Sequence, residues 1–252
     1  MVMFYVLKIA YDGSEYAGWQ RQTNALSVQE CIENALLEAL GVDVRVNASG
    51  RTDAGVHAAG QVCSFFANVS VPADRMPDCL NRYLPPSIRI LEGWEGADGF
   101  DVCRHAKRKT YRYRLYESAW EHPLLDHYAS RVETLPSMEK LQKAAKLMEG
   151  EHDFKAFCAS GSSVKTTVRT VYLVELVEKV EYGVRVVEMY VTGNGFLYNM
   201  VRTMAGELLD LALGRRTEES LLKAYETGDR GLLGKTMPAK GLTMMSVEYE
   251  TK

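Results

Sequence analysis

The chain has 252 residues, of which 46% are hydrophobic and 25% are charged, and its formal net charge is -3 at pH 7. This composition is typical of a globular protein with enough chain for a large core, in one large domain or two smaller ones. No apolar run approaches the roughly 20 residues of a membrane span, and the N-terminus lacks a signal-peptide pattern. We therefore expect a cytoplasmic protein that does not associate with membranes. The acidic balance argues against non-specific binding of polyanions, although the distribution of charge matters more than its sum.

The five cysteines are scattered, odd in number and never spaced as CxxC. This usage is typical of reduced intracellular thiols rather than of a disulfide framework. The five histidines form no HxxxH pattern and no cluster with cysteine, so we expect no metal site.

The first half of the chain predicts the order β-α-β-β-α-β. Ser27 and Glu30 have the spacing of a capping box, which predicts the start of a helix. Gly41 is a stop signal at which this helix should end. The expected elements are a strand at 1–10, an aromatic loop at 11–20, the helix between Ser27 and Gly41, strands at 42–48 and from 62, a short helix at 76–83 and an extended segment at 88–91.

The second half repeats this order of elements without a repeat of residues. We expect a strand at 110–116, a helix from Ser137 to Gly150, antiparallel strands at 168–180 and 184–191, helices at 196–213 and 217–225, and a last strand at 242–249. This order predicts an α+β fold with two ferredoxin-like or RRM-like halves, residues 1–103 and 104–252. Their antiparallel sheets would lie side by side around a central cleft.

A glycine-punctuated loop at 50–60, with the sequence GRTDAGVHAAG, separates two predicted strands. Glycines at positions 50, 55 and 60 allow positive φ angles or a close approach of the backbone to another group. Asp53 lies between the first two glycines, beside Arg51, and an apolar run follows the loop. Such a loop suits the presentation of a side chain at the edge of a rigid sheet, so Asp53 is a candidate catalytic carboxylate. The alternative is a glycine-rich turn with a local ion pair.

Residues 104–114 carry cations without a single acid. The six cationic residues are Arg104, Lys107, Arg108, Lys109, Arg112 and Arg114. Strand periodicity predicts Tyr111 and Tyr113 on one face, and Arg112 and Arg114 on the other. Cations beside aromatic rings suit a flexible RNA strand, because charge neutralises phosphates and a ring stacks on an unpaired base. The alternative is a solvated basic strand with structural tyrosines.

Arg202 lies among apolar residues of the predicted helix at 196–213. An unpaired buried charge costs several kcal/mol, so this arginine either extends to solvent or contacts a carboxylate. Glu207 cannot face Arg202 within one helix, which makes Asp53 the candidate partner. Farther along, residues 237–242 form a turn that either places Leu242 over a planar ligand or simply leads into the last strand.

Together these segments resemble the tRNA pseudouridine synthase A family, the TruA type. The resemblance runs in order along nearly the whole chain, and its GRTDAGVHA run is very specific. It comprises YDG at 11–13, GWQ at 18–20, GRTDAGVHA at 50–58, KTYRY at 109–113, HDF at 152–154, GNGF at 193–196, MVR at 200–202 and AKGL at 239–242.

The resemblance implies conversion of uridine to pseudouridine at positions 38, 39 and 40 of the tRNA anticodon stem-loop. It also implies a homodimer without metal or organic cofactor, and the paired RRM-like architecture with a central cleft. By the same resemblance, Asp53 is the catalytic aspartate, and Tyr111 is the ring that stacks on the target uracil. Arg202 is the cation paired with Asp53, and Arg51 holds the target nucleotide or the RNA backbone. Leu242 covers the base.

One segment departs from the family. Many members have Phe-His-Ala-Arg before the basic strand, whereas this chain has FDVCR at 100–104, so no RNA contact is assigned there. Two other functions stay open: a non-catalytic RNA-binding module and a carboxylate-dependent nucleoside hydrolase. A hydrolase normally needs a second acidic group facing the first, and the central loop has only one.

Overall fold

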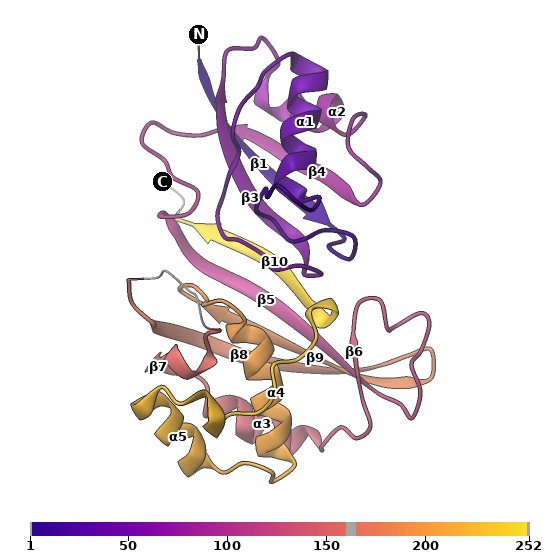
Figure 1. The fold of residues 1–252 in the computed structure, drawn as a ribbon, viewed down its shortest axis with the longest axis vertical. Helices are drawn as coiled ribbons and strands as arrows, with labels where there is room; N and C mark the ends of the chain where they lie inside the picture. The colour runs from indigo at the N-terminus through magenta and orange to yellow at the C-terminus, as the bar shows by residue number, and fades with distance from the viewer. Residues whose placement is uncertain (1, 160–164, 251–252) are drawn as a thin grey trace. The chain divides into compact units, whose positions relative to one another are not determined.

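The computed structural model describes residues 2–159 and 165–250, and its fold is mixed α+β, as predicted. Two compact units are present (Figure 1): unit 1 comprises Met1–Lys107 with Met244–Lys252, and unit 2 comprises Arg108–Thr243. The last strand, β10 (Leu242–Tyr249), therefore contributes only its first two residues to unit 2. The sequence predicted instead that the whole of this strand belongs to the second half, residues 104–252.

Unit 1 has the predicted order of elements. These are β1 (Met3–Tyr11), α1 (Val28–Leu40), β2 (Asn47–Ala48), β3 (His57–Ala67), α2 (Met76–Leu80) and β4 (Ile88–Glu95). The strand order is β4-β1-β3, with β10 next to β3 and β2 also paired with β3. β1 is antiparallel to both β3 and β4. Helices α1 and α2 contact each other beside these strands (Figure 1).

Helix α1 begins and ends where the sequence predicts. The Ser27 hydroxyl accepts a hydrogen bond from the Glu30 N–H, and Gly41 takes a left-handed conformation with φ of 68°. Because glycine has no Cβ, it adopts this conformation without steric strain. Of the apolar residues that recur at helical spacing, Val28, Ile32, Ala35 and Leu36 are buried, whereas Ala39 is only partly buried.

The strand predicted at 42–48 is wrong for most of its length, because only Asn47–Ala48 pairs with a neighbouring strand. At Val46, side chains of α1 replace the ladder partners. The Val46 N–H donates to the Glu33 carboxylate, and the Val46 carbonyl accepts from the Gln29 amide. The alternating apolar pattern therefore reflects a segment that packs against a helix rather than within a sheet.

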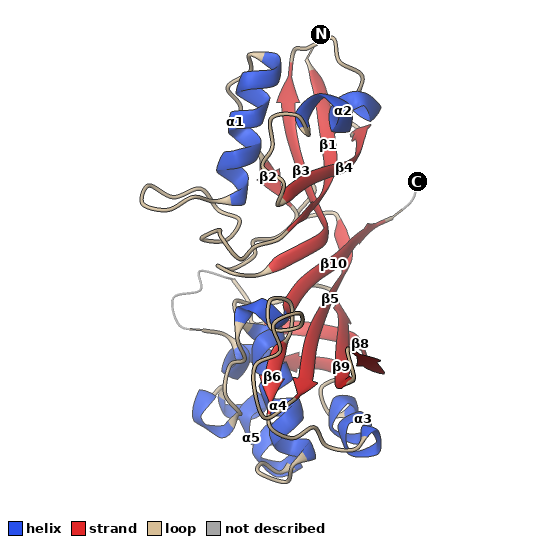
Figure 2. Ribbon diagram, turned by 90° about the vertical axis from the view of Figure 1, so that its right-hand side faces the viewer, coloured by secondary structure: helices blue, strands red, loops and turns tan. Residues whose placement is uncertain are grey.

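Unit 2 carries the remaining elements. They are β5 (Ala106–Glu117), β6 (Ser130–Val132), α3 (Met138–Lys146), β7 (Gly150–Asp153), β8 (Val168–Glu181), β9 (Val184–Gly193), α4 (Met200–Ala212) and α5 (Glu218–Thr227). The strand order is β5-β9-β8-β7, all antiparallel, and β6 pairs with β5 in parallel. Helix α3 packs against α4 and β8, and Figure 2 shows the helices of this unit in blue beside its strands. The predicted turn between β8 and β9 is confirmed, with φ of 53° at Tyr182 and 76° at Gly183.

Two helix boundaries differ from the prediction. Helix α4 begins at Met200 rather than 196, because Asn199 has a left-handed conformation with φ of 64°. Helix α3 ends at Lys146, and Gly150, predicted to close it, instead begins β7 with φ of 108°. In both cases apolar residues just outside the helix continue its apolar spacing although they are not helical. The spacing alone therefore predicted a helix that is too long.

Among the described residues, no helix combines the length and the apolar character needed to cross a membrane. Each of the five cysteines is a free thiol, as their spacing predicts.

Candidate active site

The Asp53 loop connects β2 to β3 at one end of the unit 1 strands. Its turn closes through a hydrogen bond of 3.1 Å from the Val56 N–H to the Asp53 carbonyl, and Gly55 has φ of 77°. Asp53 is half-buried, Arg51 is exposed, and Thr52 between them is buried. The loop thus buries the middle of the predicted motif and leaves the flanking charged side chains accessible to different degrees.

A second loop, which runs from the last residue of β1 at 11 to residue 21, clamps the Asp53 loop through its main chain. The Trp19 N–H donates to the Thr52 carbonyl at 2.9 Å, and the Gly55 N–H donates to the Tyr16 carbonyl at 3.4 Å. The hydroxyls of Tyr11 and Thr52 are 2.7 Å apart. Burial raises the pKa of Tyr11 to about 12, so its phenol stays protonated at neutral pH. The backbone on the N-terminal side of Asp53 is therefore fixed by several contacts.

Two glycines of the clamping loop allow this close approach. A Cβ atom at Gly18, whose φ is 92°, would lie 2.5 Å from the Thr52 carbonyl oxygen. A Cβ atom at Gly13 would lie 2.0 Å from the Val56 carbonyl oxygen. Any larger residue at either position would displace the Asp53 loop, so the glycines of the YDG and GWQ motifs support the loop sterically.

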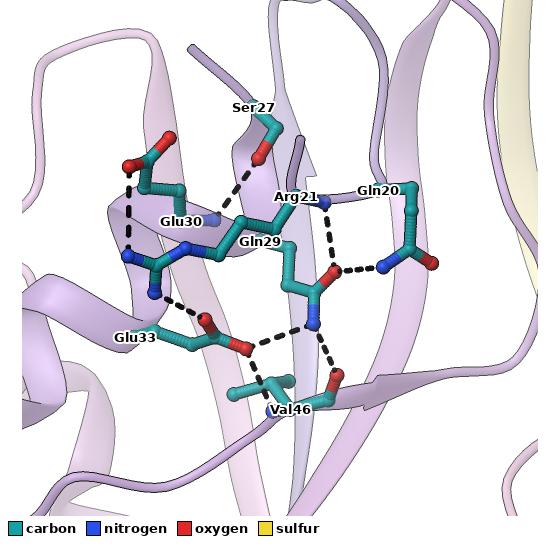
Figure 3. A network of polar contacts seen from close by, with 7 residues as sticks. All are labelled: Gln20, Arg21, Ser27, Gln29, Glu30, Glu33 and Val46. Atoms are coloured by element: carbon teal, nitrogen blue, oxygen red, sulfur yellow. Dashed lines mark hydrogen bonds and ion pairs between the residues drawn. The ribbon is translucent and has the colours of Figure 1, made fainter. Parts of the chain in front are cut away.

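Side chains of α1 hold the end of the clamping loop, as the network in Figure 3 shows. Gln29 accepts hydrogen bonds from the Gln20 amide at 2.9 Å and from the Arg21 N–H at 3.0 Å. The Glu33 carboxylate pairs with the Arg21 guanidinium at 2.9 Å. Gln29 and Glu33 are the same side chains that hydrogen-bond to Val46. One helix thus supports both the clamping loop and the segment that leads to β2.

The sequence interpretation missed these supporting residues. Tyr11, Trp19 and Thr52 lie within the motifs that carried the family resemblance, but they were not assigned a role. For Tyr11 and Thr52 the hydroxyl groups were the available signal, because buried groups of this kind find hydrogen-bond partners. Trp19 donates its main-chain N–H, for which its side chain gives no signal.

In unit 2, Tyr111 lies on β5 opposite Val191 of β9 and is 7% exposed. Its ring contacts Phe196 edge to face, with centroids 5.1 Å apart and an interplanar angle of 81°. Tyr113 on the same face is fully buried. The predicted alternation of the two tyrosines with Arg112 is confirmed, and it gives Tyr111 a fixed orientation.

Arg202 on α4 is anchored by two neutral acceptors. Its Nε donates to the Met237 carbonyl at 2.7 Å, and its Nη1 donates to the Asn199 side-chain oxygen at 2.7 Å. The guanidinium is therefore oriented by protein groups rather than simply extended into solvent. Asp53 belongs to the other unit, and its pairing with Arg202 stays a prediction.

Leu242 is buried at the start of β10, directly after a 3-10 helix at Ala239–Gly241. The predicted turn at 237–242 is confirmed and packs on Tyr113. A Cβ atom at Gly241 would lie 2.6 Å from the Tyr113 ring, and the Tyr113 hydroxyl donates to the Pro238 carbonyl at 2.8 Å. These contacts fix the position of Leu242 relative to β5.

The basic strand is partly neutralised by acids that its local sequence does not reveal. Glu188 of β9 is buried and lies 3.1 Å from Arg114 Nε, 3.6 Å from Arg112 Nη1 and 2.8 Å from Lys179 Nζ. Glu181 of β8 pairs with Arg114 as well. Burial alone would raise the pKa of Glu188, but hydrogen bonding from Lys179 and the neighbouring positive charges outweigh it and lower this pKa. Arg112 and Arg114 therefore take part in ion pairs within unit 2, an arrangement that neither the RNA-contact interpretation nor the solvated-strand alternative predicted.

Taken by itself, the Asp53 loop presents a carboxylate on a braced backbone, which suits nucleophilic or acid–base chemistry. Among the described residues, no three histidine, cysteine, aspartate or glutamate side chains are grouped to hold a metal ion. The α+β fold with this loop is that of a candidate carboxylate-dependent enzyme.

Comparisons with known proteins identify the family. The sequence model described as tRNA pseudouridine synthase matches residues 8–93 and 144–250. The tRNA pseudouridine synthase A of Acetivibrio thermocellus is 42% identical over 243 residues, which cover 96% of this chain and 98% of that protein. The protein of the same name from Ruminiclostridium cellulolyticum is 40% identical with the same coverage. Among solved structures, a chain in the crystal structure of a Cbf5-Nop10-Gar1 complex covers 96% of this chain and 58% of its own length, at 12% identity and a TM-score of 0.38.

The chain belongs to the tRNA pseudouridine synthase family, of the type named tRNA pseudouridine synthase A, and its enzyme class is isomerase. The resemblance predicted from the motifs is thus confirmed by the sequence matches.

Proposed function

We propose that this enzyme converts uridine to pseudouridine at positions 38, 39 and 40 of the tRNA anticodon stem-loop, with Asp53 as the catalytic carboxylate. The family membership supports the reaction and the tRNA substrate. The observation that carries the assignment of Asp53 is the clamp on its loop, in which Trp19 and Tyr11 hold Thr52 while Asp53 stays half-buried. A catalytic group needs such a preorganised backbone.

The chemistry requires one carboxylate and no group donor. Pseudouridine formation breaks the N1–C1′ glycosidic bond, turns the uracil and rejoins it to the ribose through C5, without a net redox change. Asp53 acts either as a nucleophile at C1′ or C6, or as a base that removes the C2′ proton. No organic cofactor or metal is needed for any of these routes.

The remaining site residues would bind and orient the uridine. Arg202 would contact Asp53 and favour its ionised form, because a neighbouring cation stabilises a carboxylate. Its anchoring to Met237 and Asn199 supports this role, since an oriented guanidinium matches carboxylate geometry.

Tyr111 would stack on the target uracil, and Leu242 would cover the base and help to exclude water. Exposed Arg51 would hold the target nucleotide or the RNA backbone. The target must leave its helix, which favours weakly paired nucleotides at a stem–loop junction. We also propose a homodimer that acts on tRNA in the cytoplasm.

The test is to map pseudouridine in tRNA treated with the purified protein. We expect modification at positions 38, 39 and 40 where uridine is present, and none in a matched tRNA with cytidine at all three. Release of free uracil without pseudouridine would identify a hydrolase instead. Binding of tRNA without either product would identify a non-catalytic RNA-binding module.

A further inference from the structure

An extended segment at 233–238 lies along α4 and is attached to that helix at successive positions. At one end, beyond α4, the Leu233 carbonyl accepts hydrogen bonds from Arg216 and Arg230, each at 3.3 Å. Farther along, the Thr236 and Thr203 hydroxyls are 3.1 Å apart. The segment thus makes side-chain contacts along its length rather than only at its ends.

At its other end this segment carries the groups that orient two site residues. The Met237 N–H donates to the Arg202 carbonyl at 3.2 Å, and the Met237 carbonyl accepts from Arg202 Nε at 2.7 Å. The next residue, Pro238, accepts the hydrogen bond from Tyr113, four residues before Leu242. A shift of the segment along α4 would therefore move the acceptor of Arg202 and the start of the turn that carries Leu242.

Glu207 of α4 fixes the middle of the segment. It is fully buried, and its Oε2 accepts a hydrogen bond of 2.6 Å from the Gly234 N–H. Its Oε1 is buried without a hydrogen-bond partner in the described part of the chain. A buried polar atom without a hydrogen-bond partner destabilises the folded state, so stability alone does not favour an acid at this position.

Close backbone contacts beside this hydrogen bond limit the registers that the segment can take. A Cβ atom at Gly206 would lie 1.9 Å from the Lys235 carbonyl oxygen, and a Cβ atom at Gly234 would lie 2.9 Å from the Gly206 carbonyl oxygen. The two glycines therefore bring helix and segment into direct contact beside the Glu207 hydrogen bond. A slip by one residue would place a side chain where only glycine fits.

We propose that Glu207 is a positioning residue for the isomerisation, which holds the 233–238 segment in register on α4 and thereby orients Arg202 and Leu242. This inference rests on the proposed roles of Arg202 and Leu242 at the uridine. Glu207 acts through the Gly234 N–H and does not touch the substrate.

The test compares kcat and KM for a tRNA transcript that carries uridine at position 39. Glu207→Met keeps the side-chain volume but removes the acceptor, and we expect kcat to fall about tenfold or more with KM changed less than about twofold. Glu207→Gln keeps an oxygen acceptor for the Gly234 N–H and should retain kcat within about twofold of the unmodified enzyme. A normal kcat for Glu207→Met, or an equal loss for both variants, would overturn the proposal.

Two further variants separate positioning from loss of folding. Tyr225→Phe removes the Tyr225 hydroxyl, a different buried polar group without a hydrogen-bond partner in the described residues. This variant should leave kcat unchanged. Gly234→Ala would push the segment from α4 while Glu207 stays intact, and it should reproduce the loss of kcat at unchanged KM even if Glu207→Met does not fold. Full activity of Gly234→Ala would contradict the proposal.

A double-mutant cycle with Arg202→Met tests the route of the effect. Because Glu207 acts partly through Arg202, the double variant should be slower than Arg202→Met by clearly less than the loss that Glu207→Met causes alone. Fully multiplied losses would overturn the proposal that Glu207 orients Arg202. Full activity of Arg202→Met would refute the proposed role of Arg202 itself, whereas a slow Arg202→Met with a normal Glu207→Met would refute only the inference about Glu207.

Discussion

The two units hold their candidate site residues in different ways. In unit 1, main-chain hydrogen bonds from a neighbouring loop and the close approach of Gly18 fix the backbone around Asp53. In unit 2, the Arg202 side chain is oriented by its own hydrogen bonds, and the 233–238 segment supplies one of the two acceptors, the Met237 carbonyl. The clamped backbone fixes where the Asp53 carboxylate lies, whereas the side-chain hydrogen bonds fix the orientation of the Arg202 guanidinium. The difference agrees with a catalytic role for Asp53 and a supporting role for Arg202.

The largest expected effect tests the catalytic side of this comparison. Asp53→Asn should lower the rate of pseudouridine formation by at least about 10³-fold, because the amide is neither a nucleophile nor a base, while tRNA affinity stays within a few-fold. The measurement is single-turnover product formation beside tRNA binding. Asp43→Asn, at an exposed position of the same unit, is the matched control and should be fully active. Substantial turnover by Asp53→Asn would refute the assignment.

The next effect concerns stability and tests whether the charges on β5 are structural. Glu188→Gln should lower the free energy of unfolding by about 3 kcal/mol at pH 7, because it leaves Arg112, Arg114 and Lys179 near a neutral group. The folded-state pKa of Glu188 lies below its ordinary value of 4.5, so the ionised group stabilises the fold above that pH. The difference between the two proteins should shrink as the pH falls below about 4.5, as measured by denaturant unfolding at several pH values. A constant difference would contradict this account.

An intermediate effect tests the ring of Tyr111. Tyr111→Ala should reduce kcat/KM by roughly 10- to 100-fold, because stacking of one base on an aromatic ring contributes about 1–3 kcal/mol. Tyr111→Phe keeps the ring and should stay within about threefold of the unmodified enzyme. Steady-state kinetics on one tRNA transcript compares them, and equal losses in both variants would rule out stacking.

The smallest effect tests the backbone clamp. Gly18→Ala should reduce kcat about tenfold, because its Cβ would displace the Thr52 carbonyl and with it the Asp53 loop. Gly41→Ala is the matched control, since Gly41 also has a positive φ but a Cβ there meets nothing within 4 Å. We expect this control to lose about 1 kcal/mol of stability and no activity. Equal activity losses in the two variants would show that strain, rather than displacement of the loop, is responsible.

The sequence also predicted much of the fold, and two of its errors arise from contacts between separate segments of the chain. Helix α1, the turn between β8 and β9, and the strand β10 were predicted closely, because capping residues, turn residues and apolar alternation are local signals. The strand at 42–48 failed because side chains of α1 satisfy the Val46 main chain. The basic strand was interpreted without Glu188 and Glu181, which are close only after the sheet has formed.

The sequence by itself determined the family and, through that resemblance, the class of reaction and the candidate carboxylate, because the GRTDAGVHA run is a specific motif within one short segment. Only the tertiary structure decided what holds that carboxylate and its supporting residues in place. Tyr11 meets Thr52 across 41 residues, Arg202 meets Met237 across 35, and Glu207 meets Gly234 across 27. Such contacts depend on how distant segments pack, and the spacing of residues along the chain carries no signal for them.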